Sequence, residues 1–190
     1  MSAAFRAKVS DFRRLAFCRP GPKTWRPSRV DNCNAVLYGV AAHVIRRLQS
    51  VLHAAARLIS GTRLRDHITP TLRDTLHWLP VAQRVEYKIA VMAFDCVRGT
   101  CPAYFRDVCR PVSTVDARSG LRSADRGDLI VPRTSGKRSR SFHCCAPTVW
   151  NSLPAHLRSG DISRRQFTSG LKTALFDRAY SPKAPSRTSV

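Results

Sequence analysis

Two groups of basic side chains are the residues of this chain best suited to chemistry at an anionic surface. One group lies in a segment without acidic residues, in which Gly136 allows a turn, and comprises Arg133, Lys137, Arg138 and Arg140. The other lies on and just after an expected helix and comprises Arg46, Arg57, Arg63 and Arg65. Guanidinium groups pair with phosphates through parallel N–H donors, so both groups predict contacts with an RNA or DNA backbone. A row of arginines on a helix is also typical of a solvated face, and that alternative stays open.

The overall charge favours the same kind of partner. The 190 residues include 33 Lys and Arg against 12 Asp and Glu, a net charge of +21, and most of the basic residues are arginine. So many positive charges repel one another in a compact chain, and an anionic polymer would offset that repulsion, so such a polymer is the expected partner. Codon bias or solubility would give the same composition. A hydrophobic content of 43% is ordinary for a globular domain, and no apolar run is long enough to cross a membrane.

The cysteines and histidines do not form a recognised catalytic or metal-binding pattern. The seven cysteines include no CxxC pair, and an odd number predicts reduced, mostly buried thiols in an intracellular protein of the nucleus or cytoplasm. A zinc site would require Cys101, Cys109, His143 and Cys144 or Cys145 to converge through the fold. The six histidines have no Cys or Ser partner at a catalytic spacing, and His77 and His143 are expected in the core or at helix caps. GxSxG, HExxH and P-loop motifs are absent, so we expect no enzyme, no metal and no cofactor.

The elements that position these residues are arranged around one long helix. Pro80 is suited to its first turn and Gly99 to a left-handed C-cap. Two apolar stripes run between them: Val81, Val85, Ile89, Met92 and Cys96, and Tyr87, Val91 and Phe94. A helix that is apolar on two faces is normally central, and Trp78 is expected to pack under its first turn.

Further helices are predicted on either side. Residues 43–59 form an amphipathic helix that ends at Gly61 and carries the first basic group. Ser163 and Gln166 match a capping box, which predicts a helix to about Tyr180. Residues 101–109 fit one short helix, residues 112–128 an exposed loop, and residues 129–134 an edge strand that returns as a hairpin through residues 141–145.

Several blocks, in order, resemble the C-terminal region of the reverse transcriptase polyprotein of non-long-terminal-repeat retrotransposons of the jockey and chicken-repeat kind. The blocks are Cys33–Gly39, Leu48-Gln49 with Ala54–Gly61, His67–Pro70, Leu76–Val81 with Arg84 and Lys88, Leu121–Ser123, Val131–Arg133, Ala146-Pro147 with Trp150–Pro154, and Phe167 with Leu171-Lys172 and Leu175-Phe176. The resemblance covers about residues 31 to 180, and the order of so many blocks makes it specific.

The resemblance implies a fragment without the family's catalytic parts. In that family this region follows the polymerase thumb, after an endonuclease and a reverse transcriptase. The reverse transcriptase binds metal ions partly through an Asp-Asp pair, whereas this chain has no such dipeptide and its one glutamate, Glu86, lies in the central helix. Non-sequence-specific nucleic-acid binding, chiefly of RNA, is the expected remaining function. The alternatives are a non-functional remnant or a protein-interaction module whose helices pack on the missing polymerase.

We therefore predict a mainly α fold: a small helical module with one short β-hairpin. Residues 1–30 form a disordered basic arm, 31–111 a helical subdomain, 112–180 the loop, hairpin and C-terminal helix, and 181–190 a disordered tail. Residues 1–30 match nothing in the family. A mitochondrial presequence is an alternative for them, although their prolines interrupt the helix that such a signal needs.

Overall fold

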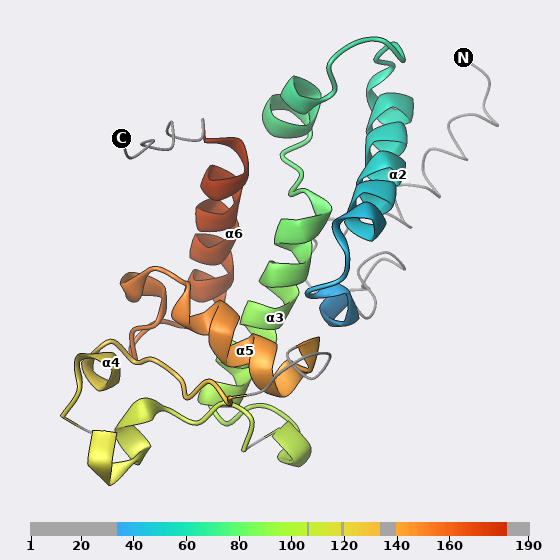
Figure 1. The fold of residues 1–190 in the computed structure, drawn as a ribbon. Helices are drawn as coiled ribbons and strands as arrows, with labels where there is room; N and C mark the ends of the chain where they lie inside the picture. Colours follow the sequence, from blue (N-terminus) through green and yellow to red (C-terminus); the bar gives the residue numbers. More distant parts are fainter. Residues whose placement is uncertain (1–33, 106, 119, 134–139, 182–190) are drawn as a thin grey trace, which may run out of the picture.

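The centre of the fold is helix α3 (Val81–Val97), against which α2 (Ala42–Ser60), α5 (Phe142–Asn151) and α6 (Arg164–Tyr180) pack (Figure 1). The computed structural model describes residues 34–105, 107–118, 120–133 and 140–181. Within these ranges the protein is mainly helical, as predicted. None of the described helices combines the length and the apolar character needed to cross a membrane.

Both ends of α3 follow the sequence pattern. Pro80 is the N-cap residue, directly before the first helical residue. Gly99 has a φ of +69°, and its N–H donates to the Cys96 carbonyl at 3.1 Å. The N–H of Thr100 donates to the Asp95 carbonyl at 2.9 Å, which completes a Schellman motif. The predicted helix and its glycine stop are therefore confirmed.

Helix α3 contributes to two hydrophobic clusters. The larger cluster fills the space between α3, α5 and α6 and contains stacked rings of Phe94 and Phe167 with centroids 4.4 Å apart. The smaller cluster joins α2 to the start of α3 through Leu52, Trp78 and Val81. The predicted burial of Trp78 under α3 is therefore confirmed. The two stripes predicted from the sequence differ in depth: in the first only Met92 is not fully buried, whereas in the second Phe94 is buried and Tyr87 and Val91 are only partly buried.

The two flanking helices are also confirmed. Gly61 ends α2 with a φ of +71°, and its N–H donates to the Arg57 carbonyl at 2.8 Å. In α6 the Ser163 hydroxyl accepts from the Gln166 N–H at 3.3 Å, while the Gln166 side chain accepts from the Ser163 N–H at 3.0 Å. This is the capping box expected from the sequence.

The predicted β-hairpin is wrong, because its returning half is the first turn of α5. Ser141 is the N-cap of α5, and its carbonyl accepts from Cys144 and Cys145 at 3.0 and 2.9 Å. Pro147 removes one hydrogen bond inside α5, yet the helix continues because the face around Val149 is buried against α3. Within the described ranges there is no strand; Leu129 makes only an isolated antiparallel bridge to Pro111.

Short helical turns replace two other predicted segments. The described residues of the segment 101–109, predicted as one helix, include the 3₁₀ turn η3 (Ala103–Phe105) and no longer helix. The predicted loop 112–128 contains η4 (Val112–Thr114), η5 (Asp116–Arg118) and α4 (Arg122–Asp125). The remaining turns are η1 (Asn34–Leu37), the π-helical η2 (Thr71–Thr75) and η7 (Ala155–Leu157). The predicted arm 1–30 and all but Ser181 of the predicted tail lie outside the described residues.

Candidate nucleic-acid interface

The basic strip, which we define as Arg46, Arg57, Arg63 and Arg65, begins on one face of α2. Arg46 and Arg57 are eleven residues apart, close to three full turns, so both lie on one side of the helix about 16 Å apart along its axis. Helix α2 contains no acidic residue. Arg46 is exposed and makes no ion pair with a carboxylate of the described chain. Among the described residues, therefore, no carboxylate competes with an external anion for its guanidinium group.

Arg57 has a structural task as well. It is half-buried, and its Nη2 donates to the backbone carbonyl of Asp66 at 3.3 Å, which holds the loop that follows α2. Its Nε is buried with no hydrogen-bond partner among the described residues. Because part of its donor capacity is directed inward, Arg57 contributes less to the strip than the sequence predicts.

A chain of side-chain hydrogen bonds joins this face to the start of α3. The Gln49 side-chain oxygen accepts from the Val81 N–H at 2.9 Å, and its nitrogen lies 2.8 Å from Nε2 of His53. Burial, and then the charge of Arg57, lower the pKa of His53. A neutral ring can accept from Gln49, so the site favours uncharged His53.

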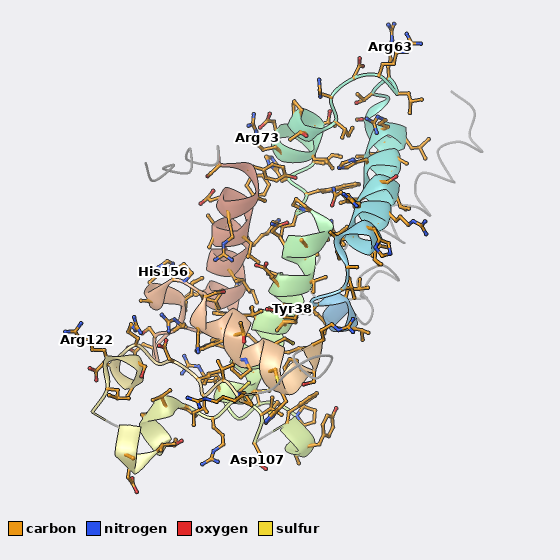
Figure 2. The ribbon with its side chains drawn as sticks, viewed as in Figure 1. Tyr38, Arg63, Arg73, Asp107, Arg122 and His156 are labelled. Atoms are coloured by element: carbon orange, nitrogen blue, oxygen red, sulfur yellow. The ribbon has the colours of Figure 1, made fainter. Side chains whose placement is uncertain are left out.

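Arg63 and Arg65 extend the strip beyond the helix. Both are exposed, and Figure 2 shows Arg63 at the tip of the loop that follows α2. The Asp66 carboxylate accepts from the backbone N–H of Arg63 at 3.2 Å, so it orders the loop without an ion pair to either guanidinium. Arg47, which the sequence interpretation omitted, is exposed one position after Arg46. It was missed because it does not share the helical spacing of Arg46 and Arg57.

The second basic group is only partly described. Arg133 and Arg140 are exposed, whereas Lys137 and Arg138 lie outside the described residues. The aliphatic stem of Arg140 lies against Gly39, where an added Cβ would be 2.9 Å from Cγ of Arg140. Gly39 immediately precedes the segment that enters α2. The structure therefore brings Arg140 to the beginning of the helix that carries the basic strip.

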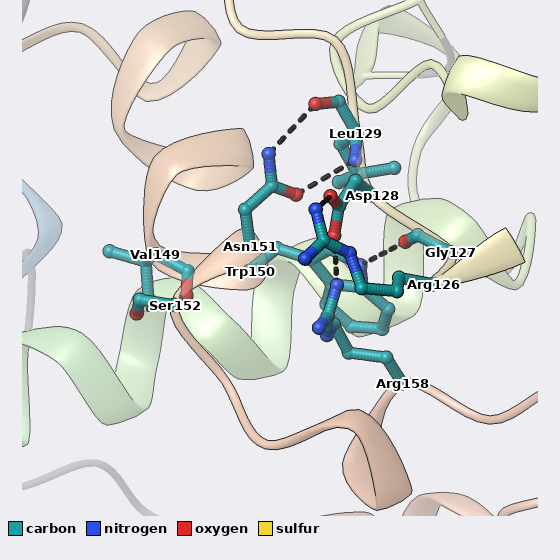
Figure 3. Close-up of polar contacts among 9 residues, drawn as sticks. All are labelled: Arg126, Gly127, Asp128, Leu129, Val149, Trp150, Asn151, Ser152 and Arg158. Carbon is teal, nitrogen blue, oxygen red and sulfur yellow. Dashed lines mark hydrogen bonds and ion pairs between the residues drawn. The ribbon is translucent and has the colours of Figure 1, made fainter. Parts of the chain in front are cut away.

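Other arginines serve the fold, which the sequence pattern does not reveal. Arg158 pairs with Asp128, and both side chains are largely buried (Figure 3). The Nε1 of Trp150 donates to the Gly127 carbonyl at 3.0 Å. Asn151 accepts from the Leu129 N–H at 2.8 Å and donates to the Leu129 carbonyl at 2.9 Å. These bonds attach the segment 127–129 to the end of α5.

Three more arginines hold α6 and its approach in place. Arg164 makes two hydrogen bonds to Asp95 at 2.7 and 3.0 Å, and Arg178 donates to Glu86 at 3.2 Å. Arg98 donates to the carbonyls of Ser159 and Ile162 at 2.9 and 3.2 Å. The excess positive charge is thus divided between arginines that make structural contacts and exposed arginines that make none with the described residues, and the latter are the better suited to an external anion.

The described residues do not assemble the zinc site considered from the sequence. Among them no group of three or more His, Cys, Asp or Glu side chains is placed to hold a metal ion. Burial raises the pKa of both Cys109 and Cys145 to about 11, as expected of buried thiols. Of the two histidines expected in the core or at helix caps, neither is in the core: both are exposed, His77 directly after the C-cap of η2 and His143 in the first turn of α5.

No protein-family model matches the chain, and no curated protein or solved structure matches it either.

Proposed function

We propose that this protein is a non-catalytic module that binds the phosphate backbone of nucleic acid, chiefly RNA, without reading its sequence. The observation that carries the proposal is the acid-free basic strip, in which Arg46, Arg63 and Arg65 are exposed and make no ion pair with a described carboxylate. Its helical part alone spans about 16 Å, the length of roughly five base-pair steps. Phosphate contacts of this kind supply affinity and position a protein, but they carry no sequence information.

We further propose that the chain derives from the C-terminal part of a non-long-terminal-repeat retrotransposon polymerase. Support comes from contacts between separate blocks of the resemblance. Gln49, from one block, caps the N–H of Val81, from another. The rings of Trp150, from the Trp150–Pro154 block, and Phe167, from the last block, stack with centroids 5.9 Å apart. Residues shared with a family for structural reasons should contact one another in this way.

The proposed fragment lacks polymerase chemistry. Two-metal phosphoryl transfer needs carboxylates held close together. Within the described ranges the carboxylates of Asp95, Asp128 and Glu86 are engaged in ion pairs with arginines. We expect primer extension with Mg²⁺ or Mn²⁺ to stay at the level of a no-protein control, and repurified protein that still extends a primer would overturn this part of the proposal.

Binding is tested with two triple variants that remove the same charge. The variant Arg46→Ala/Arg63→Ala/Arg65→Ala removes the three exposed guanidinium groups of the basic strip. The control removes three exposed arginines from other elements: Arg110→Ala/Arg122→Ala/Arg165→Ala. Fluorescence anisotropy with an RNA hairpin and a DNA duplex should show weaker binding to both for the strip variant and near-parental binding for the control. Equal losses of affinity in the two variants would mean that the net charge of the whole protein, and not the basic strip, determines binding. A third variant with alanine at positions 133, 137, 138 and 140 measures the contribution of the second group.

A protein-interaction module is the second candidate, favoured by apolar side chains on α2 that are exposed in the described part of the chain. Val51 is 57% exposed and Leu58 is 55% exposed; they are seven residues apart and therefore on one face. Leu64, beyond the helix, is 85% exposed. A helix of a missing polymerase part could pack on this stripe. Val51→Ser/Leu58→Ser should weaken association with a retrotransposon polymerase lacking this region while leaving RNA affinity unchanged; the reverse result would reject this candidate.

A further inference from the structure

His77 adopts a backbone conformation that its turn would adopt more easily with glycine. Among the described residues it is the one non-glycine with positive φ, at +50°. It follows the C-cap of η2, where the N–H of Trp78 donates to the Leu72 carbonyl at 2.8 Å. The same chain uses glycines with positive φ at the ends of α2 and α3: Gly61 is the C-cap of α2, and Gly99 follows the C-cap of α3. Because glycine satisfies such a turn without strain, the imidazole ring is what histidine adds here.

The ring is exposed and is supported by aromatic residues from α6. Its centroid lies 6.2 Å from that of Phe176 at an interplanar angle of 54°, and Phe176 lies 4.7 Å from Tyr180. The Tyr180 hydroxyl donates to the Trp78 carbonyl at 2.6 Å, which joins the end of α6 to the residue after His77. Phe176 and Tyr180 are half-buried. The ring of His77 is therefore held by a fixed aromatic support while remaining accessible.

Two guanidinium groups lie near this aromatic group. Burial raises the pKa of Tyr180, and the guanidinium groups of Arg84 and Arg73 oppose that shift, so both charges act near its hydroxyl. Arg73 is itself paired with Asp74 at 2.6 and 3.0 Å, which offsets part of its charge. Figure 2 shows Arg73 near the C-terminal end of α6, at the same end of the molecule as Arg63. The aromatic group thus lies at the end where the basic strip finishes.

We propose that His77, supported by Phe176 and Tyr180, is a stacking site for an unpaired base of single-stranded nucleic acid. Every base has a π-face that can stack on histidine, and nearby arginines favour the adjoining phosphate. This inference rests on the proposed phosphate binding and adds that the bound strand has an accessible single-stranded stretch. The strain at His77 is retained because glycine in its place would provide no stacking surface.

The first test uses the unaltered protein and two probes that share one backbone. One is a short unstructured thymidylate oligonucleotide, and the other is an abasic oligonucleotide of the same length. Stacking of a base should make the thymidylate bind about tenfold more tightly. Equal, measurable affinities would overturn the stacking site and leave the phosphate-binding proposal intact. Failure of the protein to bind either probe or the RNA hairpin would overturn both.

The second test assigns the preference to His77. His77→Gly removes the ring and the strain together, so it should melt no lower than the parent while binding both probes as the parent binds the abasic one. His77→Asn, which tolerates positive φ, provides a second ring-free variant. His156→Asn is the control, since His156 is exposed in η7, a turn that packs on α6 through Leu157 and Gly170. Folded ring-free variants that keep the tenfold preference would overturn the assignment, as would an equal loss in the control.

Discussion

The attachment of residues 127–129 to α5 depends on one amide side chain, and replacing it should be costly. Asn151→Ala removes a hydrogen bond to the Leu129 N–H and another to its carbonyl, at 2.8 and 2.9 Å. Leu129 is only 2% exposed, so water cannot readily replace both bonds. Each bond contributes about 1 kcal/mol net, and an unsatisfied buried group costs about 1–3 kcal/mol. We expect a loss of about 2–4 kcal/mol in the free energy of unfolding.

Urea denaturation followed by tryptophan fluorescence measures this loss, since Trp150 is adjacent to the altered residue. Thr148→Ala is the matched control in the same helix: its hydroxyl donates only to the Cys144 carbonyl one turn earlier, and its side chain is exposed. The control should stay within about 0.5 kcal/mol of the parent. A loss below about 1 kcal/mol for Asn151→Ala would show that the bonds to Leu129 do not hold this segment.

Three further outcomes follow from buried groups. Trp78→Ala should cost about 3–5 kcal/mol in thermal or urea unfolding, because it leaves a cavity between α2 and α3, and an unchanged melting curve would contradict this. The pKa of His53 is lowered in the folded state, so the unfolded state binds more protons. Stability should therefore be retained above about pH 6.5, the ordinary histidine pKa, and fall as the pH drops below it. His53→Gln should flatten that dependence, which unfolding curves across the pH range would reveal. Iodoacetamide should modify partly exposed Cys101 before Cys109 and Cys145, whose pKa burial raises to about 11; mass spectrometry of native protein showing equal labelling would contradict this.

The sequence predicts an element well where the decisive signals are local. The capping box of Ser163 and Gln166 lies within four consecutive residues, and the stops at Gly61 and Gly99 require only a positive φ after a helix. These interactions involve only residues that are close together in the sequence. The ends of α2, α3 and α6 therefore follow directly from the residue types.

The prediction failed where contacts between residues far apart in the sequence determine the local structure. The segment 141–145 is predicted as the second strand of a hairpin only because it follows the predicted edge strand 129–134 after a connection in which Gly136 allows a turn. Its helical form depends on burial of the face around Val149 and Trp150 against α3. The bonds from Asn151 to Leu129 cross 22 residues, and no periodic pattern indicates them.

In the candidate site too, local spacing was predicted correctly and contacts that depend on the fold were missed. Helical spacing predicted that Arg46 and Arg57 share a face. It could not predict that Arg57 donates to the Asp66 carbonyl, because that contact depends on how the loop folds back on α2. The positive φ of His77 could not be predicted either, since the residue type alone does not indicate this backbone conformation. An exposed histidine in that conformation is apparent only once the backbone is known.

The dependence of duplex DNA affinity on salt tests the central claim most directly. Each lost phosphate contact should reduce the slope of log K against log salt by about 0.9 on duplex DNA. We predict that Arg46→Ala/Arg63→Ala/Arg65→Ala reduces the slope by about 2–3 units, whereas Arg110→Ala/Arg122→Ala/Arg165→Ala leaves it near the parental value. Both triple variants lower the net charge of +21 by the same amount. Identical slopes for the two would therefore contradict a phosphate-binding strip that begins on α2.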